Sequence, residues 1–365
     1  MGLDIMPTRV LFVFVLPSGG VDTLNRMRIQ ALAGRNIEAH LLYFQSGSGL
    51  QNNAGNKVFY TGEPAQIGRI LSEGRYSAIV VLSFFMQLSL FRQLGFQGPI
   101  IFEIQGFGPE NVARDTLLAA APFLGPYADA FLYPHTPHIG RILREGYPHK
   151  PMFAFNNPFD ADSFRYRKND GYPRPVLAWI GRLEANKNWR DFLAIAAKVM
   201  DDRPDAEAWM FSDPWLAEHG EHEKLAERIR ALGIEGKVRQ LHNVPHNRMA
   251  GLYSQIGDSG GVLCMTSQTE GAPYAALEAL SCRCPVLTTD SDGVRSSLLD
   301  GVTALYYDHG DIDGAAAKAL RLMRDRQLRS ALVRDGEKHV RENFTLEQYA
   351  DHFVRMLGAL GVSAC

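Results

Sequence analysis

The first half of the chain shows two patterns of hydrophobic and polar positions. Short apolar runs typical of buried strands are separated by stretches with helical spacing of apolar residues. The predicted strands cover residues 9–16, 37–44, 78–83, 99–104, 130–133 and 152–155, and residues 21–33 are predicted to form a helix. Because strands and helices alternate, we expect parallel βαβ units.

The same pattern restarts in the second half. Strands are predicted at 174–180, 206–211, 237–241, 261–265 and 285–288, and helices at 189–201, 222–232, 249–255, 272–280, 311–324 and 328–336. A polar segment with glycine and proline at 163–175 separates the halves. The sequence therefore predicts an α/β protein with two doubly wound domains, 1–166 and 167–342, and a ligand at the carboxyl ends of their strands.

Composition narrows the class of protein. A chain of 365 residues with a net charge of −2 lacks the basic bias of nucleic-acid-binding proteins. No apolar run reaches the roughly 20 residues of a transmembrane helix, and Pro17 ends the first apolar run as it would end a strand. Cys264, Cys282 and Cys284 are predicted to be buried thiols, because no spacing indicates a zinc site. We expect a soluble cytoplasmic protein.

Two carboxylates lie in a setting that suits a sugar nucleotide. An apolar strand leads into a loop with Glu270 and then a helix with Glu278 about two turns later. Backbone N–H groups at a helix start attract phosphate, and carboxylates accept hydrogen bonds from hydroxyl groups. Either residue alone is also consistent with a capping acid or a solvated helix position, but together they favour a binding site.

Two cations follow the strand at 174–180. Gly181 turns the chain, and Arg182 and Lys187 come next. Arginine can fork onto two phosphate oxygens while lysine acts as a point charge, so the pair can neutralise a departing diphosphate without a metal ion. Surface residues of an ordinary strand–helix loop would look the same when taken alone.

Gly19 and Gly20 follow the first strand and open the first helix. Glycines there allow an anion or a substrate to approach the backbone closely. The pattern is neither GxGxxG nor a GxxxxGK[ST] phosphate loop, so it predicts neither a dinucleotide fingerprint nor a Walker loop.

Taken in order, these three segments resemble family 4 of the retaining glycosyltransferases across essentially the whole chain. The resemblance implies the GT-B fold, in which two Rossmann-like domains face a central cleft and residues 343–365 return to the first domain as a helix. It implies a hexosyltransferase (EC 2.4) that moves a sugar from a nucleoside-diphosphate sugar, with UDP-sugar expected, to an acceptor hydroxyl with retention of configuration.

The resemblance also implies roles for individual residues. Arg182 and Lys187 would contact the diphosphate, Glu278 the ribose and Glu270 the donor sugar, with Glu270, Arg182 and Lys187 as the catalytic residues. The expected donor-binding residues are Gly20, Gly181, Arg182, Lys187, Glu270, Gly271, Ala272, Pro273, Tyr274 and Glu278. The candidate acceptor-side residues are Gly19, Gln105 and His135.

The acceptor side departs from the family pattern. Gln105 stands where the family often has a histidine, and a glutamine can orient a hydroxyl but cannot exchange a proton near neutral pH. Other GT-B enzymes, such as a nucleotide-sugar epimerase, and a non-catalytic nucleotide-sugar-binding partner therefore stay open as alternatives. For His242 and His246, which flank a loop expected near the nucleotide base, main-chain contacts are favoured over side-chain contacts.

No cofactor and no metal ion are expected, since the nucleotide-sugar is a substrate. Asp290-x-Asp292 looks like the metal-binding DxD of other glycosyltransferases, but it lies in a loop that the resemblance already explains. The expected partners are the donor and a small-molecule, glycan or lipid-linked acceptor, without nucleic acid. Membrane association is not indicated, and the oligomeric state is left open.

Overall fold

The computed structural model describes residues 7–53, 55–291 and 293–363 and divides into two compact units. Unit 1 comprises Met1–Asp160 and Asn343–Cys365, and unit 2 comprises Ala161–Glu342. The sequence placed the end of the first domain at residue 166, but the segment 161–166 packs on unit 2. There the Tyr166 N–H donates to the Ser281 carbonyl at 3.1 Å, and Ser281 Oγ donates to the Phe164 carbonyl at 2.6 Å.

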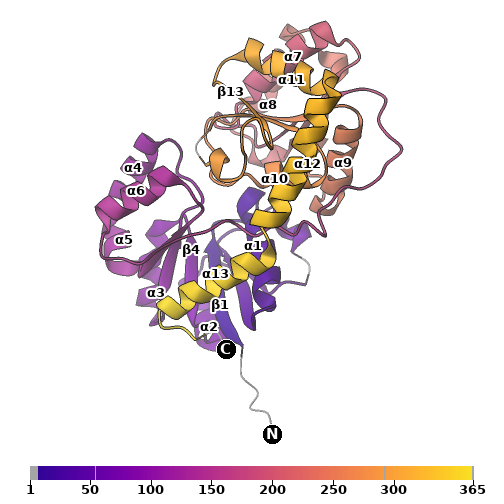
Figure 1. The fold of residues 1–365 in the computed structure, drawn as a ribbon. Coiled ribbons are helices and arrows are strands. Elements are labelled where there is room, and N and C mark those ends of the chain that lie inside the picture. Colours follow the sequence, from indigo (N-terminus) through magenta and orange to yellow (C-terminus); the bar gives the residue numbers. More distant parts are fainter. Residues whose placement is uncertain (1–6, 54, 292, 364–365) are drawn as a thin grey trace. The chain divides into compact units, whose positions relative to one another are not determined.

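Unit 1 contains a seven-stranded parallel sheet in the order β3-β2-β1-β4-β5-β6-β7. Its strands are β1 (Thr8–Phe14), β2 (Ile37–Tyr43), β3 (Val58–Tyr60), β4 (Ala78–Leu82), β5 (Ile100–Glu103), β6 (Ala130–Tyr133) and β7 (Met152–Ala154). Figure 1 labels its central strands β1 and β4. The chain order reverses between β1 and β4, so this is a doubly wound sheet with its switch point there.

The central strands of unit 1 are apolar because both faces of the sheet are covered. Every residue of β4 is buried, and Val10 to Val13 of β1 have no exposed surface. Parallel sheets with helices on both faces require such continuous apolar strands. The helices are α1 (Gly19–Ala33), α2 (Pro64–Gly74), α3 (Leu88–Gln93), α4 (Glu110–Ala119), α5 (Ala121–Tyr127), α6 (Pro137–Gly146) and α13 (Leu346–Ala359), with 3₁₀ turns η1 (Ser48–Asn52) and η2 (Phe85–Gln87).

Helix α13 returns from the far end of the chain to unit 1, as the sequence predicts. It begins with a capping box, in which Thr345 Oγ1 accepts from the Gln348 N–H and Gln348 Oε1 accepts from the Thr345 N–H. The helix packs against α1, and the Phe353 ring lies 5.7 Å from the Phe12 ring of β1. The predicted closing helix is therefore confirmed as part of unit 1.

Unit 2 contains a six-stranded parallel sheet in the order β10-β9-β8-β11-β12-β13. Its strands are β8 (Val176–Ile180), β9 (Glu207–Ser212), β10 (Val238–His242), β11 (Val262–Met265), β12 (Val286–Thr289) and β13 (Leu305–Tyr307). Its helices are α7 (Trp189–Asp202), α8 (Glu221–Ala231), α9 (His246–Asp258), α10 (Tyr274–Ser281), α11 (Ile312–Arg324) and α12 (Arg326–Asn343), with 3₁₀ turns η3 (Pro214–Leu216), η4 (Glu235–Lys237) and η5 (Val294–Ser296). The chain order reverses between β8 and β11.

The predicted α/β class with two Rossmann-like domains is thus confirmed, with two strands that the sequence did not indicate. Strands β3 and β13 have three residues each and lie at sheet edges. Three residues show little of a strand period, and of the three strands this short only β7 was predicted. Cys264, Cys282 and Cys284 are buried as predicted, and Cys365 lies outside the described residues.

Candidate functional site

Lys187 and Glu270, from loops that follow neighbouring strands, meet in unit 2. Strand β8 leads to the loop with Lys187, and its partner β11 leads to the loop with Glu270. Lys187 Nζ donates to Glu270 Oε1 at 2.5 Å, and Ser267 Oγ donates to the same oxygen at 2.6 Å. Because β8 and β11 flank the switch point, this pair lies at the edge of the sheet where doubly wound domains bind ligands.

Asn186 joins the two loops through both ends of its side chain. Its Oδ1 accepts from the N–H and the hydroxyl of Thr269 at 3.1 and 2.8 Å, and its Nδ2 donates to the Thr269 carbonyl at 3.2 Å. The Thr266 hydroxyl donates to the Lys187 carbonyl at 2.8 Å. These residues were not predicted from the sequence, although their position beside the predicted cation and acid was a usable signal. They hold Lys187 and Glu270 in place.

Two glycines allow the loops around Glu270 to pack closely. A Cβ at Gly181 would lie 2.9 Å from the Trp179 ring and 3.0 Å from Lys187 Cγ. Gly293 has a φ of +82°, and a Cβ there would lie 2.1 Å from the Gly271 carbonyl oxygen. Only glycine fits at 293, so the loop after β12 lies directly on residues 270–271.

The loop after β12 contains the DxD pattern, but only its first aspartate, Asp290, lies among the described residues. Arg295 Nε donates to Asp290 Oδ1 at 2.8 Å, so the Asp290 carboxylate is paired with a guanidinium. Asp292 lies outside the described residues. Within 7–53, 55–291 and 293–363, no group of three or more metal-binding side chains is found.

Arg182 does not join the Lys187–Glu270 pair. Its side chain is exposed, and its guanidinium lies 3.1 Å from the Glu184 carboxylate, two residues along the same loop. The other predicted donor residues form a continuous segment. Gly271, Ala272 and Pro273 connect Glu270 to α10, which begins at Tyr274. The structure therefore brings together Gly181, Lys187 and Glu270, with Arg182 on the same loop but turned to Glu184.

Glu278 is held by a histidine that the sequence analysis did not assign to it. The Glu278 side chain on α10 is almost fully buried, and Glu278 Oε1 lies 2.7 Å from Nε2 of His246, the first residue of α9. A carboxylate can only accept, so Nε2 carries the proton of this bond. The His246 ring also packs 5.0 Å from the Phe164 ring. Burial, followed by the charge of Glu278, raises the pKa of Tyr253 well above its ordinary value.

The predicted acceptor-side residues in unit 1 occupy separate places. Gly19 and Gly20 are exposed at the start of α1, and Gly19 has a φ of +62°, which glycine adopts without strain. Gln105 follows β5, where its carboxamide donates to Glu103 Oε1 at 2.5 Å and accepts from Asn157 Nδ2 at 2.7 Å. Glu103 in turn pairs with Arg28 of α1 inside unit 1. None of these partners of Gln105 was expected from the sequence.

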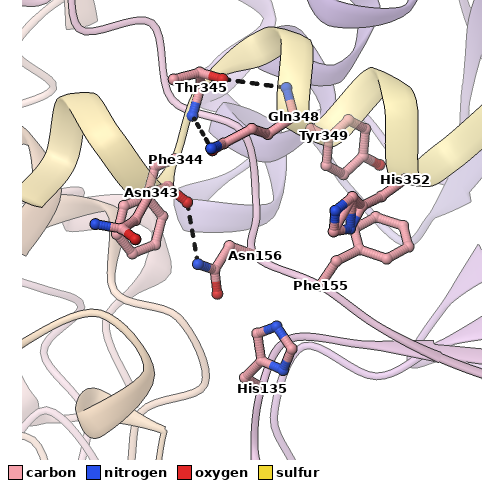
Figure 2. Close-up of a pocket in the computed structure, with 9 residues that line it drawn as sticks. All are labelled: His135, Phe155, Asn156, Asn343, Phe344, Thr345, Gln348, Tyr349 and His352. Carbon is pink, nitrogen blue, oxygen red and sulfur yellow. Dashed lines mark hydrogen bonds between the residues drawn. The ribbon is translucent and has the colours of Figure 1, made fainter.

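His135 lines a cavity of unit 1 that is shown in Figure 2. The cavity has a volume of about 180 Å³. It is lined by His135, Phe155, Asn156, Asn343, Phe344, Thr345, Gln348, Tyr349 and His352. Neither Gln105 nor Gly19 is among the lining residues, so the structure does not bring the three predicted acceptor-side residues into one pocket.

Comparisons with solved structures define the fold. HepE from Anabaena, determined in complex with UDP-glucose, superposes with a TM-score of 0.81 over 96% of this chain and 99% of its own at 16% identity. Sucrose-phosphate synthase from Thermosynechococcus elongatus superposes with a TM-score of 0.80 over 97% of this chain and 99% of its own at 15% identity. The chain has the two-domain GT-B fold that these proteins share.

Sequence comparison relates unit 2 to a family of transferases. The family model of the glycosyl transferases group 1 matches residues 160–339. A 2-deoxystreptamine N-acetyl-D-glucosaminyltransferase from Streptomyces fradiae is 28% identical over 149 residues, which are 40% of this chain and 34% of that protein. The match therefore spans about a third of that relative. The predicted GT-B fold is confirmed, the match to the group 1 glycosyl transferases supports the predicted class of enzyme, and the assignment to family 4 stays a prediction.

No helix in the described part of the chain is long and apolar enough to cross a membrane.

Proposed function

We propose that this protein is a retaining, metal-independent hexosyltransferase that moves a sugar from UDP to an acceptor hydroxyl. One observation carries the proposal: the Lys187–Glu270 pair, held by Asn186, lies at the switch point of a group 1 domain. An ammonium and a carboxylate in that position provide the two groups that a sugar diphosphate requires, a cation for the phosphate and an acceptor for sugar hydroxyls.

Lys187 is suited to bind the diphosphate because it is partly exposed and its bond to Glu270 is reversible. A phosphate oxygen would take the place of the Glu270 carboxylate on Nζ, and Glu270 would then accept from a hydroxyl of the sugar. Arg182 would join by leaving Glu184, an exchange that costs little because the arginine side chain is exposed. The backbone N–H groups of residues 271–274, ahead of α10, would supply further donors.

Glu278 would bind the ribose of the donor. His246 fixes one carboxylate oxygen, and a carboxylate has further lone pairs for the two ribose hydroxyls. Such a contact is the same in the ground state and in the transition state, so it contributes to donor affinity more than to turnover.

The reaction would then proceed on one face of the sugar. The bond from the anomeric carbon to the diphosphate oxygen breaks, the bond to the acceptor oxygen forms on the same face, and the acceptor proton passes to the departing phosphate. Lys187 and Arg182 would stabilise the charge that develops on the diphosphate, and such preorganised electrostatics supply much of the rate. Gln105 would orient the acceptor hydroxyl without exchanging a proton.

Nucleotide selectivity can be read from unit 2 alone, because all four tryptophans of the chain (179, 189, 209 and 215) lie within it. We expect UDP, at about 100 times its Kd, to raise the melting temperature followed by tryptophan fluorescence by roughly 5–10 °C, and ADP and GDP to raise it less. An equal response to the three nucleotides would contradict the assignment of uridine. The UDP in the HepE complex supports testing it first.

Transfer is tested by incubating UDP-sugars with a panel of acceptor glycosides in EDTA. We expect transfer to persist in EDTA and nuclear magnetic resonance to show a product with the anomeric configuration of the donor. Loss of transfer on chelation, restored by Mg²⁺, would contradict metal independence. Conversion of the donor to an epimer without acceptor would instead support the epimerase alternative.

A further inference from the structure

Unit 1 contains an ion pair with almost no exposed surface. Arg28 of α1 forks onto Glu103 at the end of β5, with Nη1–Oε2 and Nη2–Oε1 distances of 2.8 and 2.7 Å. The two side chains are 0% and 1% exposed, and the guanidinium lies 4.5 Å from the centre of the Phe12 ring. Buried charges are stable only when they are paired, so Arg28 supplies the countercharge for a Glu103 carboxylate, which can accept hydrogen bonds but cannot donate them.

This carboxylate determines the orientation of the Gln105 side chain. Since Glu103 only accepts, the amide nitrogen of Gln105 must face it, and Nε2 lies 2.5 Å from Glu103 Oε1. The second hydrogen of Nε2 is directed to Asn157 Oδ1 at 3.2 Å, and Asn157 Nδ2 donates to Gln105 Oε1 at 2.7 Å. Both hydrogens of the Gln105 amide are therefore used inside unit 1, and its oxygen keeps one lone pair.

We propose that Arg28, Glu103 and Asn157 are positioning residues that lock the Gln105 carboxamide so that it offers a substrate only an acceptor oxygen. The proposal rests on the proposed function, in which Gln105 lies on the acceptor side. A hydroxyl can donate to that oxygen, whereas a carbonyl or an ionised phosphate cannot. The network thus selects an acceptor group that carries a hydrogen and excludes Gln105 as a proton donor.

The burial of the network members is consistent with a positioning role for Glu103 and Asn157. Glu103 and Asn157 are buried, while Gln105 is only half-buried. Gln105 is therefore the member of this hydrogen-bond network that has exposed surface. The buried members set the direction of its carboxamide without touching the substrate themselves.

Gln105→Glu tests the proposal through its pH dependence. While the introduced carboxyl is protonated, it can donate its O–H to Glu103 and keep a carbonyl oxygen for the substrate, as Gln105 does. Ionisation would place two carboxylates within hydrogen-bond distance, so the carboxyl pair should lose its proton well above the ordinary glutamate pKa of about 4.3. We expect the acceptor KM of this variant to rise with pH through that ionisation, while the wild-type acceptor KM shows no such step.

The groups that interact with Glu103 do not change charge between pH 5 and 9. Arg28 of α1 forms the ion pair with Glu103 of β5, and the phenol of Tyr349 from α13 interacts electrostatically with both. Arginine stays protonated throughout this range. Burial raises the pKa of Tyr349 above its ordinary value, so its phenol stays neutral.

Gln30→Glu is the matched control. Gln30 of α1 also donates from Nε2 to a carboxylate, Asp160 Oδ2, at 2.9 Å, but its side chain is exposed. The same substitution beside a carboxylate should leave the pH profile of the acceptor KM as in the wild type. A Gln30→Glu profile with the same step as Gln105→Glu would show a general effect of the new charge and overturn the proposal.

Gln105→Met provides a second test that adds no charge. It removes the acceptor oxygen at nearly constant length, so we expect the acceptor KM to rise about five- to tenfold at every pH and the donor KM to stay unchanged. Wild-type transfer combined with an unchanged acceptor KM in this variant, or a wild-type pH profile in Gln105→Glu, would overturn the positioning role. Absence of transfer in the wild type would instead refute the proposed function, so the two failures are distinguishable.

Discussion

The Lys187–Glu270 pair of unit 2 and the Arg28–Glu103 pair of unit 1 both lie where parallel strands end, yet their burial differs. The side chains are 23% and 12% exposed in the first pair, against 0% and 1% in the second. A partly exposed pair can exchange one partner for a ligand at small cost. A fully buried pair cannot, because separation leaves an uncompensated charge in the interior.

This difference distinguishes binding from positioning. Lys187 can release Glu270 to meet a phosphate, so the first pair is suited to the donor. Glu103 cannot release Arg28, so its effect reaches the substrate only through Gln105. The family model matches residues 160–339, which lie almost entirely within unit 2, so the network around Gln105 lies outside the matched region.

Arg28→Met should have the largest effect, on stability. Removal of the guanidinium leaves the Glu103 charge buried and unpaired, and we expect unit 1 to lose about 3–5 kcal/mol of its free energy of unfolding. Hydrogen exchange followed by mass spectrometry on α1 and β5 peptides would measure the loss. Tryptophan fluorescence reports only unit 2 and serves as an internal control. Unchanged protection of these peptides would contradict the contrast between the pairs.

Lys187→Ala should act on turnover. Loss of one preorganised cation typically lowers the rate by roughly 10²–10³, and we expect kcat/KM to fall by that factor while the tryptophan melting temperature changes little. Lys198→Ala is the matched control, because this lysine of α7 forms an ion pair with Asp313 on the surface of the same unit. Arg182→Ala should cause a loss of the same order, and near wild-type turnover would remove it from the diphosphate site.

Glu278→Gln should act mainly on donor affinity. The neutral amide keeps the shape of the side chain but is a weaker acceptor for ribose hydroxyls, so we expect the donor KM to rise about tenfold and kcat to change less. Initial rates at varied UDP-sugar concentration separate the two constants. A fall in kcat at constant KM would place Glu278 in the chemical step instead.

His246→Asn should have the smallest effect of the series. Asparagine is too short to reach Glu278 Oε1 from the start of α9, so the carboxylate would lose one partner and its fixed orientation. We expect a two- to fivefold rise in donor KM, about the value of one hydrogen bond, and no change in acceptor KM. Combined with Glu278→Gln, it should add little, because both substitutions act on the same contact. Fully additive effects would show that His246 contacts the donor independently of Glu278.

The alternation of strands and helices was sufficient to predict the fold, since β4 and residues 10–14 of β1 are apolar and the pattern restarts at residue 174. Of the three-residue edge strands, β7 was predicted whereas β3 and β13 were not, because so short a run carries little periodic signal. The resemblance to family 4 predicted Lys187 and Glu270 at one donor site, and the structure brings them together because their loops follow the neighbouring strands β8 and β11.

The supporting contacts depend on three-dimensional register that one sequence does not reveal. Arg28 and Glu103 are separated by 75 positions, and His246 and Glu278 by 32. The first pair meets because α1 brings Arg28 to the end of β5. The second meets because the start of α9 brings His246 to α10. Sequence reasoning therefore found the groups proposed to bind the donor but not the groups that hold them.

Binding of UDP to the Lys187→Ala variant tests the central claim most directly. Isothermal titration would compare UDP and uridine with the wild type, Lys187→Ala and Lys198→Ala. The account predicts that UDP binds Lys187→Ala about 10- to 100-fold more weakly than the wild type, because a charge-assisted contact to phosphate is lost, while uridine binding is unchanged and Lys198→Ala resembles the wild type. Equal affinity of UDP for the wild type and Lys187→Ala would contradict it.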